Sequence, residues 1–114
     1  MSLNLFLDRL NSEPETVTFD ETMALIEQNY TYQDTAFSNG EMELVAGQSS
    51  GSCKIFAFGQ LNGLSELQTL HCFGDYYRVD VLGSPEGSGH ANIRSFMQHG
   101  WSGIRFSGDA LTGQ

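Results

Sequence analysis

Apolar residues recur at helical spacing in the first thirty positions, with one interruption. After Ser2 this spacing predicts a short amphipathic helix, with Ser2 as its N-cap and apolar positions at Leu3, Phe6, Leu7 and Leu10. Pro14 ends this helix, and residues 16–19 are predicted to be extended. A second helix is expected next, capped by Asp20, with its apolar positions at Met23, Ile26 and Tyr30.

Residues 31–51 lack helical periodicity. The stretch YTYQDTAF is rich in residues that favour strands, and Asn39-Gly40 is typical of a tight hairpin turn. We therefore expect a small hairpin over residues 35–44 and a flexible loop over residues 47–51.

The apolar run CKIFAFGQL, residues 53–61, is compatible with either a buried strand or a buried helix. The residues that follow favour the helix. Gly63 suits the position just after a helix, and Ser65 with Gln68 forms a capping box for the next helix. That next helix is predicted to continue to Gly83, with apolar positions at Leu67, Leu70, Phe73 and Tyr77. Gly74 within it costs about 1 kcal/mol relative to alanine, which indicates close packing there.

The remaining segment, HANIRSFMQHG, is predicted to be a helix that ends at Gly100 and faces inward through Ile93, Phe96 and Met97. The stretch WSGIRF has the composition of a final strand, and residues 107–114 are expected to be a frayed tail. The length of 114 residues fits one compact domain. The sequence therefore predicts an α+β fold, a single small helix-rich domain over residues 1–106 with a few short strands.

Charge narrows the range of partners. The formal net charge is −9 with only five basic residues, so we expect no binding to nucleic acid or to anionic membranes. Between Arg9 and Lys54 the charged residues are all acidic: Glu13, Glu15, Asp20, Glu21, Glu27, Asp34, Glu41 and Glu43. This segment is either a solvated acidic face or a docking face for a basic protein partner.

The N-terminus and the cysteines indicate a cytoplasmic protein. The sequence MSLNLFLDRL has no basic segment before its apolar residues, and no apolar run approaches the length of a membrane span. Two cysteines, Cys53 and Cys72, do not form a disulfide framework, so both thiols are expected to be reduced.

The stretch AGQSSGSCK, residues 46–54, raises two chemical hypotheses. As a phosphate-binding loop it fails, because Gly47 and Gly51 are one residue too close and Lys54 does not follow the second glycine. As the start of a helix capped by Ser52, it would place Cys53 at the first helical position, where the helix dipole and Lys54 lower a thiol pKa. Cys53 is then either a nucleophile with a histidine base, or a small buried residue. Cys72 is predicted to lie in the core.

The available bases are His71, His90 and His99. Nine positions along one predicted helix separate His90 from His99, which places them about 13 Å apart on opposite faces. They therefore cannot share an ion, and we expect neither a metal site nor a cofactor.

The stretch GDYYR, residues 74–78, is the other candidate site. Asp75 and Arg78 are spaced to form an ion pair, and Tyr76 and Tyr77 cannot both face inward. The stretch is either a surface ion pair with amphipathic aromatics or a polar recognition site.

Two long segments, GSCKIFAFGQLNGLSELQTLHCFGDYYR and HANIRSFMQHGWSGIRF, resemble the HopJ family of type III effector proteins. The resemblance runs from about Phe19 to Phe106, and departures are expected in GEMELVAGQSS. Its matching positions add Lys54, Arg94 and Trp101 to the binding candidates. The family name implies delivery to a host cell by type III secretion, but the resemblance brings no reaction, cofactor or catalytic residue.

Two hypotheses of function follow. The favoured one is a non-enzymatic interaction or effector protein that binds a basic protein surface through its acidic face. The alternative is a cysteine-dependent enzyme with Cys53 as the nucleophile and a histidine as the base.

Overall fold

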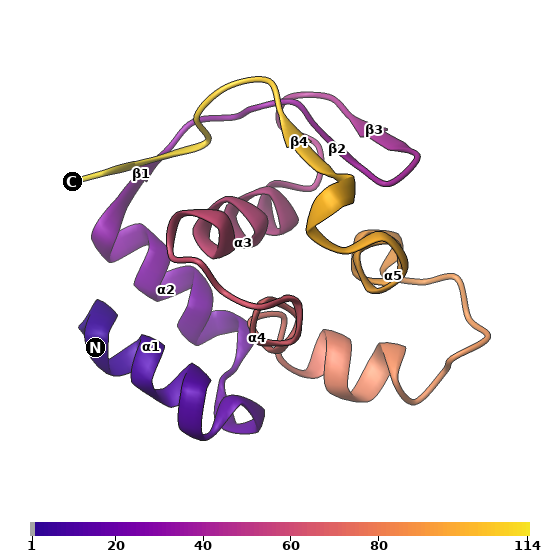
Figure 1. Ribbon diagram of the computed structural model, residues 1–114, viewed down its shortest axis with the longest axis horizontal. Coiled ribbons are helices and arrows are strands. Elements are labelled where there is room, and N and C mark those ends of the chain that lie inside the picture. The colour runs from indigo at the N-terminus through magenta and orange to yellow at the C-terminus, as the bar shows by residue number, and fades with distance from the viewer. Residues whose placement is uncertain (1) are drawn as a thin grey trace.

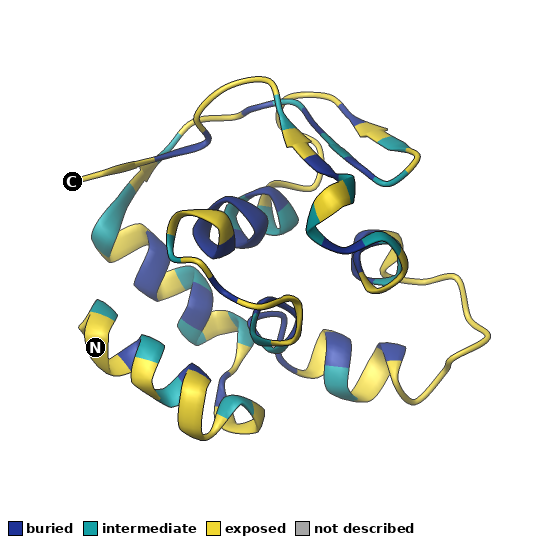
Figure 2. Cartoon of the chain, in the orientation of Figure 1, coloured by how far each residue is buried: buried dark blue, intermediate teal, exposed yellow. Residues whose placement is uncertain are grey.

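The apolar segment that follows the Gly-Ser stretch is helix α3 (Ser50–Leu61), which lies at the centre of the fold (Figure 1). Phe56 and Phe58 are fully buried within it. Other elements surround α3, so it lacks the polar stripe of a surface helix (Figure 2). This explains why its hydrophobic pattern alone did not distinguish a helix from a strand.

The computed structural model describes residues 2–114 and has the α+β fold that the sequence predicts. The other helices are α1 (Leu3–Ser12), α2 (Phe19–Asn29), α4 (Glu66–His71) and α5 (Ala91–His99), with the short helices η1 (Pro14–Thr16), η2 (Tyr76–Val81) and η3 (Gly100–Gly103). The strands are β1 (Tyr30–Tyr32), β2 (Phe37–Asn39), β3 (Met42–Leu44), β4 (Ile104–Phe106) and β5 (Leu111–Gly113).

The strands form two small antiparallel sheets. One has the order β3-β2-β4, and its β2–β3 pair is the predicted hairpin, with Asn39 opposite Met42. The other pairs β1 with β5, so the chain end lies beside the segment that follows α2 (Figure 1). The expectation of a frayed tail is therefore wrong for β5, because Ala110 and Leu111 are buried and the strand pairs with β1.

Side-chain capping starts three of the helices. Ser2 caps α1, as predicted, and Ser65 with Gln68 forms the predicted capping box of α4. The cap of α2 is Thr18 rather than Asp20, and Thr18 and Glu21 make a reciprocal capping box. The extended stretch predicted over residues 16–19 is shorter in the structure, because Thr16 belongs to η1 and α2 begins already at Phe19.

The long helix predicted over residues 65–83 is broken. Gly74 has a φ of +61°, which ends the helical path after α4, and the chain resumes as the wider helix η2. The inward-facing residues also differ from the prediction, since Leu67 and Met97 are about half exposed. The loop predicted at 47–51 ends sooner than expected, because α3 already begins at Ser50.

Candidate functional site

A cleft of about 590 Å³ opens between α3, α5, strand β3 and the aromatic residues on either side of Gly74. Its apolar surface comes from Phe19, Met42, Leu44, Phe73, Tyr76 and Ile93. The rest of its lining consists of polar side chains and of backbone at the starts of α3 and α5: Gln48, Ser49, Gly51, Ser52, His90, Ala91 and Asn92. The cleft thus combines an apolar lining with polar groups contributed mainly by the starts of α3 and α5.

Gly74 brings the aromatic surface of the cleft together. A Cβ atom at this position would lie 2.6 Å from the backbone nitrogen of Phe19, so only glycine lets the two backbones approach this closely. Phe19 then meets Tyr76 edge to face, with ring centroids 5.0 Å apart. The close packing predicted at Gly74 is confirmed, and its consequence is the position of Phe19.

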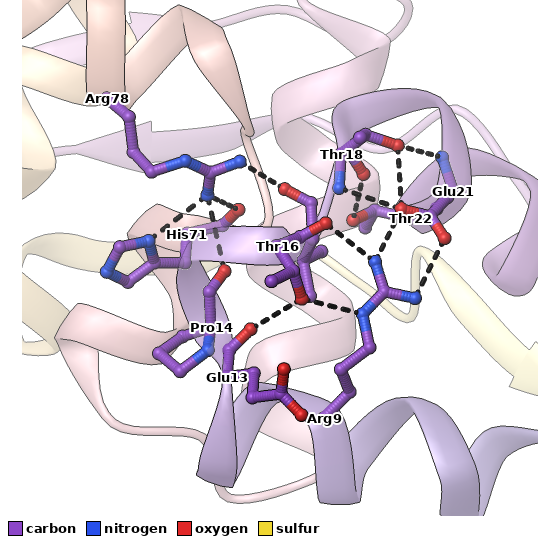
Figure 3. A network of polar contacts seen from close by, with 10 residues as sticks. Arg9, Glu13, Pro14, Thr16, Thr18, Glu21, Thr22, His71 and Arg78 are labelled. Carbon is purple, nitrogen blue, oxygen red and sulfur yellow. Dashed lines mark hydrogen bonds and ion pairs between the residues drawn. The ribbon is translucent and has the colours of Figure 1, made fainter.

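A polar network holds the segment before Phe19 in place (Figure 3). The Arg78 guanidinium donates to the carbonyl oxygens of Pro14, Val17 and His71. Its Nη1 lies 3.1 Å from His71 Nδ1, which must therefore be the unprotonated acceptor of that ring. Burial and then the Arg78 charge lower the pKa of His71. Arg78, predicted as a binding residue, is thus used within the fold, and it does not pair with Asp75.

An ion pair completes the network on the other side of the same segment. Arg9 Nη1 donates to Glu21 Oε2 at 2.8 Å, and the Arg9 hydrogen bond lowers the pKa of Glu21 to about 2. Arg9 Nη2 also donates to the Thr16 carbonyl oxygen. Residues 14–18 are therefore fixed from both sides.

Two helices, α3 and α5, begin at the cleft without a side-chain cap. Their N-cap residues, Ser49 and His90, have φ values of 55° and 58° and are the non-glycine residues of positive φ within 2–114. The first intrahelical hydrogen bonds come from the N–H groups of Cys53 and Ile93. Within the described chain, the preceding N–H groups of each helix have no protein acceptor. The Gly-Ser stretch is thus an open helix start that borders a cleft.

Asn92 adds a buried amide to this border. Its side-chain oxygen accepts a hydrogen bond from Asn39 Nδ2 at 3.0 Å, and the same Nδ2 donates to the Asn92 carbonyl oxygen at 2.9 Å. Asn92 is only 9% exposed and lines the cleft. Its own Nδ2 has no hydrogen-bond partner in residues 2–114 and is not among the fully buried unpaired atoms, so it remains accessible as a donor.

Cys53 does not lie where the nucleophile hypothesis requires. Because Ser49 rather than Ser52 is the N-cap, Cys53 occupies the fourth helical position instead of the first. The thiol is 1% exposed, and its sulfur lies 3.6 Å from the Thr35 carbonyl oxygen. Burial raises the pKa of Cys53 rather than lowering it. Cys72 is buried as predicted, and burial raises its pKa to about 12.

We expect iodoacetamide to leave both cysteines unmodified in the native protein, because a buried thiol of raised pKa is neither accessible nor ionised at neutral pH. Mass spectrometry across a pH series, with and without urea, measures this. An exposed cysteine introduced by Ser88→Cys should react at once and serves as the positive control. Rapid native labelling of Cys53 with a midpoint well below about 8.5 would instead favour a catalytic thiolate.

The three histidines are dispersed over the fold. His71 contacts Arg78, and His90 Nε2 lies 3.0 Å from Asp80 Oδ2 and its ring packs against Tyr76. His99 packs against Gly40, where an added Cβ would overlap its ring. Within residues 2–114, no three His, Cys, Asp or Glu side chains are placed to hold one metal ion.

Some of the predicted binding residues lie in the cleft region, and the others are buried or make contacts within the fold. Tyr76 lines the cleft, and Asp75 lines an adjoining depression of about 300 Å³ together with Asp20. Tyr77 is buried. Three others make contacts within the fold: the Lys54 ammonium lies over the Tyr32 ring, Arg94 donates to the Gly89 carbonyl oxygen, and Trp101 Nε1 donates to the Leu64 carbonyl oxygen.

The acidic residues are mostly exposed and unneutralised. Of the eight that lie between Arg9 and Lys54, all but Glu21 are exposed. Ion pairs within residues 2–114 involve two acidic side chains, Glu21 with Arg9 and Asp80 with His90. The described helices also include none long and apolar enough to cross a bilayer.

Sequence reasoning missed Phe19, Ser49 and Asn92 as parts of a site. The sequence predicts an extended stretch at Phe19, and no local pattern indicates that Gly74 packs against it. The Gly-Ser stretch gave no signal for Ser49, because its serines suggest a side-chain cap that α3 does not have. Asn92 becomes recognisable only through Asn39, 53 residues away in the sequence.

Comparisons with known proteins place this fold in a family. The crystal structure of a protein of unknown function, VPA0580, matches the chain with a TM-score of 0.98 and 53% sequence identity, covering 100% of this chain and 95% of that one. A search of curated proteins finds no significant match. The model of the HopJ type III effector proteins matches residues 3–111, nearly the whole chain and including β5. The resemblance seen in the sequence is thereby confirmed, and this chain belongs to the HopJ type III effector protein family.

Proposed function

We propose that this protein is a non-enzymatic interaction domain that binds basic segments of partner proteins on its acidic surface. One observation carries the proposal: seven exposed carboxylates between residues 10 and 53 have no cationic partner among residues 2–114. An uncompensated surface of one sign attracts segments of the opposite sign and raises their association rate.

The chemistry of the fold supports binding over catalysis. The sulfur that could have been a nucleophile is buried, and the histidine rings contact Arg78, Asp80 and Gly40. The family description, type III effector proteins, is compatible with a protein that acts by contacting partner proteins in a recipient cell. The same binding chemistry would operate in the bacterial cytoplasm.

Peptide binding at two salt concentrations tests the proposal. The probes are three fluorescein-labelled decapeptides that share a free carboxyl-terminal leucine and differ only at six positions. These positions are lysine or arginine in the basic peptide, glutamine in the neutral peptide and glutamate in the acidic peptide. Fluorescence anisotropy should detect binding of the basic peptide alone. Its affinity should fall about tenfold between 50 and 300 mM NaCl, because the Debye length is already near 10 Å at 0.1 M salt.

Absence of binding by all three peptides would contradict the proposal. So would equal binding of the basic and the glutamine peptides, or an affinity that salt does not change, because neither result needs the carboxylates.

A further inference from the structure

We propose that the cleft binds the carboxyl-terminal end of a partner chain, one whose last side chain is apolar and whose preceding residues are basic. This inference rests on the proposed function and names the segment that is bound. The open starts of α3 and α5 would hold the terminal carboxylate, and the aromatic surface would take the last side chain. The adjoining acidic depression would take the basic residues.

Unpaired backbone donors form part of the polar lining of the cleft. The N-terminal N–H groups of α3 and α5 have no acceptor in residues 2–114, and Gly51, Ser52, Ala91 and Asn92 line the cleft. The first turn of a helix also carries positive partial charge. The Asn92 amide is an independent donor, because Asn39 occupies its oxygen and leaves its Nδ2 unpaired in a side chain that is 9% exposed.

The lining of the cleft favours a carboxylate over a phosphate. Within residues 2–114 no lysine or arginine lines it, and its one histidine, His90, already contacts Asp80, so a doubly charged anion would have no unpaired cation beside it. A single negative charge can be held by backbone N–H groups alone, which is a known mode of capturing a chain terminus. The donors border an apolar trough, so the carboxylate must be attached to an apolar group.

The basic part of the ligand follows from the neighbouring depression. The cleft and this depression share Phe19, Phe73 and Tyr76, so a segment lying across these rings reaches both. The depression carries Asp20 and Asp75, which are exposed and have no ion-pair partner in the described chain. Residues that precede the terminal one would therefore place lysine or arginine against these carboxylates.

The decisive experiment compares the basic leucine-ended decapeptide with its carboxyl-terminal amide by fluorescence anisotropy. The amide carries one more net positive charge, so attraction to an acidic surface alone predicts that it binds at least as well as the free acid. The proposal predicts the opposite, with the free acid bound about tenfold more tightly because charge-assisted hydrogen bonds are lost in the amide.

Asn92→Asp tests the location of the carboxylate. The variant keeps an oxygen acceptor for Asn39 but replaces the free donor with a negative charge, and it should abolish the preference for the free acid. Asn11→Asp makes the same chemical change at an exposed position of α1 and should leave the preference intact. Urea unfolding verifies that both variants fold.

Two further binding experiments test the apolar lining of the cleft and the acidic depression, using the wild-type protein and surface variants. A probe that ends in glycine should bind about tenfold more weakly than the leucine probe, since the apolar trough is then unfilled. Asp20→Asn with Asp75→Asn should weaken the basic probe more than Asp8→Asn with Glu86→Gln, which changes net charge equally at exposed positions elsewhere.

Three results would overturn the inference. Equal affinity for the free acid and the amide would show that the terminal carboxylate does not contribute to binding. The proposed function would not be contradicted, since basic peptides would still bind. A preference that survives in folded Asn92→Asp would place the carboxylate outside the cleft. Displacement of the probe by octanoate at the same concentration as the unlabelled peptide would identify a fatty acid, not a chain terminus, as the occupant.

Discussion

Gly74→Ala is expected to lower the free energy of unfolding by about 3 kcal/mol, measured by urea denaturation. An alanine at a φ of +61° is strained by roughly 1–2 kcal/mol. Its Cβ would also lie 2.6 Å from the Phe19 nitrogen and 3.2 Å from the Thr18 carbonyl carbon. Both are backbone atoms that cannot rotate away, so relief requires movement of the start of α2, which adds about 1–3 kcal/mol.

Gly63→Ala is the matched control. Its φ of +62° is nearly the same, but a Cβ there would meet nothing within 4 Å, so only the strain of the left-handed conformation remains. We expect a loss of about 1 kcal/mol. Equal losses of unfolding free energy in the two variants would mean that the backbones at Gly74 and Phe19 are not in tight contact. The close approach at Gly74 would then not explain the position of Phe19 in the cleft.

The elements that local sequence predicts well are those whose signals lie within a few residues of one another. The capping box of Ser65 and Gln68, the C-terminal Gly63 and the 35–44 hairpin are all of this kind, and each is confirmed. The break at Gly74 is different, because a glycine within an apolar pattern does not say whether it is helical or left-handed. That choice depends on the Phe19 backbone, 55 residues earlier in the chain.

The tail was mispredicted for a related reason. Residues 107–114 are polar and glycine-rich, as frayed ends are, but β1 offers Leu111 an antiparallel partner about 80 residues away. A strand of only three residues is too short to show a clear alternation of apolar and polar positions in the sequence. Only the apolar pair Ala110 and Leu111 hinted at burial.

In the candidate site, too, local signals were predictable from the sequence and long-range contacts were not. Tyr76 and Asp75 were found because their stretch is locally unusual, whereas Arg78 in the same stretch proved to hold the backbone of Pro14 and Val17. An arginine that serves recognition and one that satisfies buried carbonyl oxygens cannot be told apart from sequence. The charge pattern could be read directly, because exposure of isolated acidic residues is the rule.

Phe56→Ala is expected to lower the free energy of unfolding by about 3–5 kcal/mol. The Phe56 ring is fully buried, and its centroid lies 4.9 Å from that of Phe96 and 5.6 Å from that of Phe73. Removing it leaves a cavity between α3, α5 and the aromatic floor of the cleft, which those rings can only partly close.

Leu61→Ala in the same helix provides the comparison, since Leu61 is 58% exposed and its truncation should cost less than about 0.5 kcal/mol. Measuring peptide binding by the Phe56→Ala and Leu61→Ala variants also distinguishes an effect on stability from an effect on the cleft. Phe73 lies between Phe56 and the cleft, so the cavity should weaken the leucine-ended probe even in Phe56→Ala protein that remains folded. A folded Phe56→Ala variant that binds the probe normally would mean that Phe73 keeps its position without Phe56, and that the cleft is held by Gly74 and the Arg78 network alone.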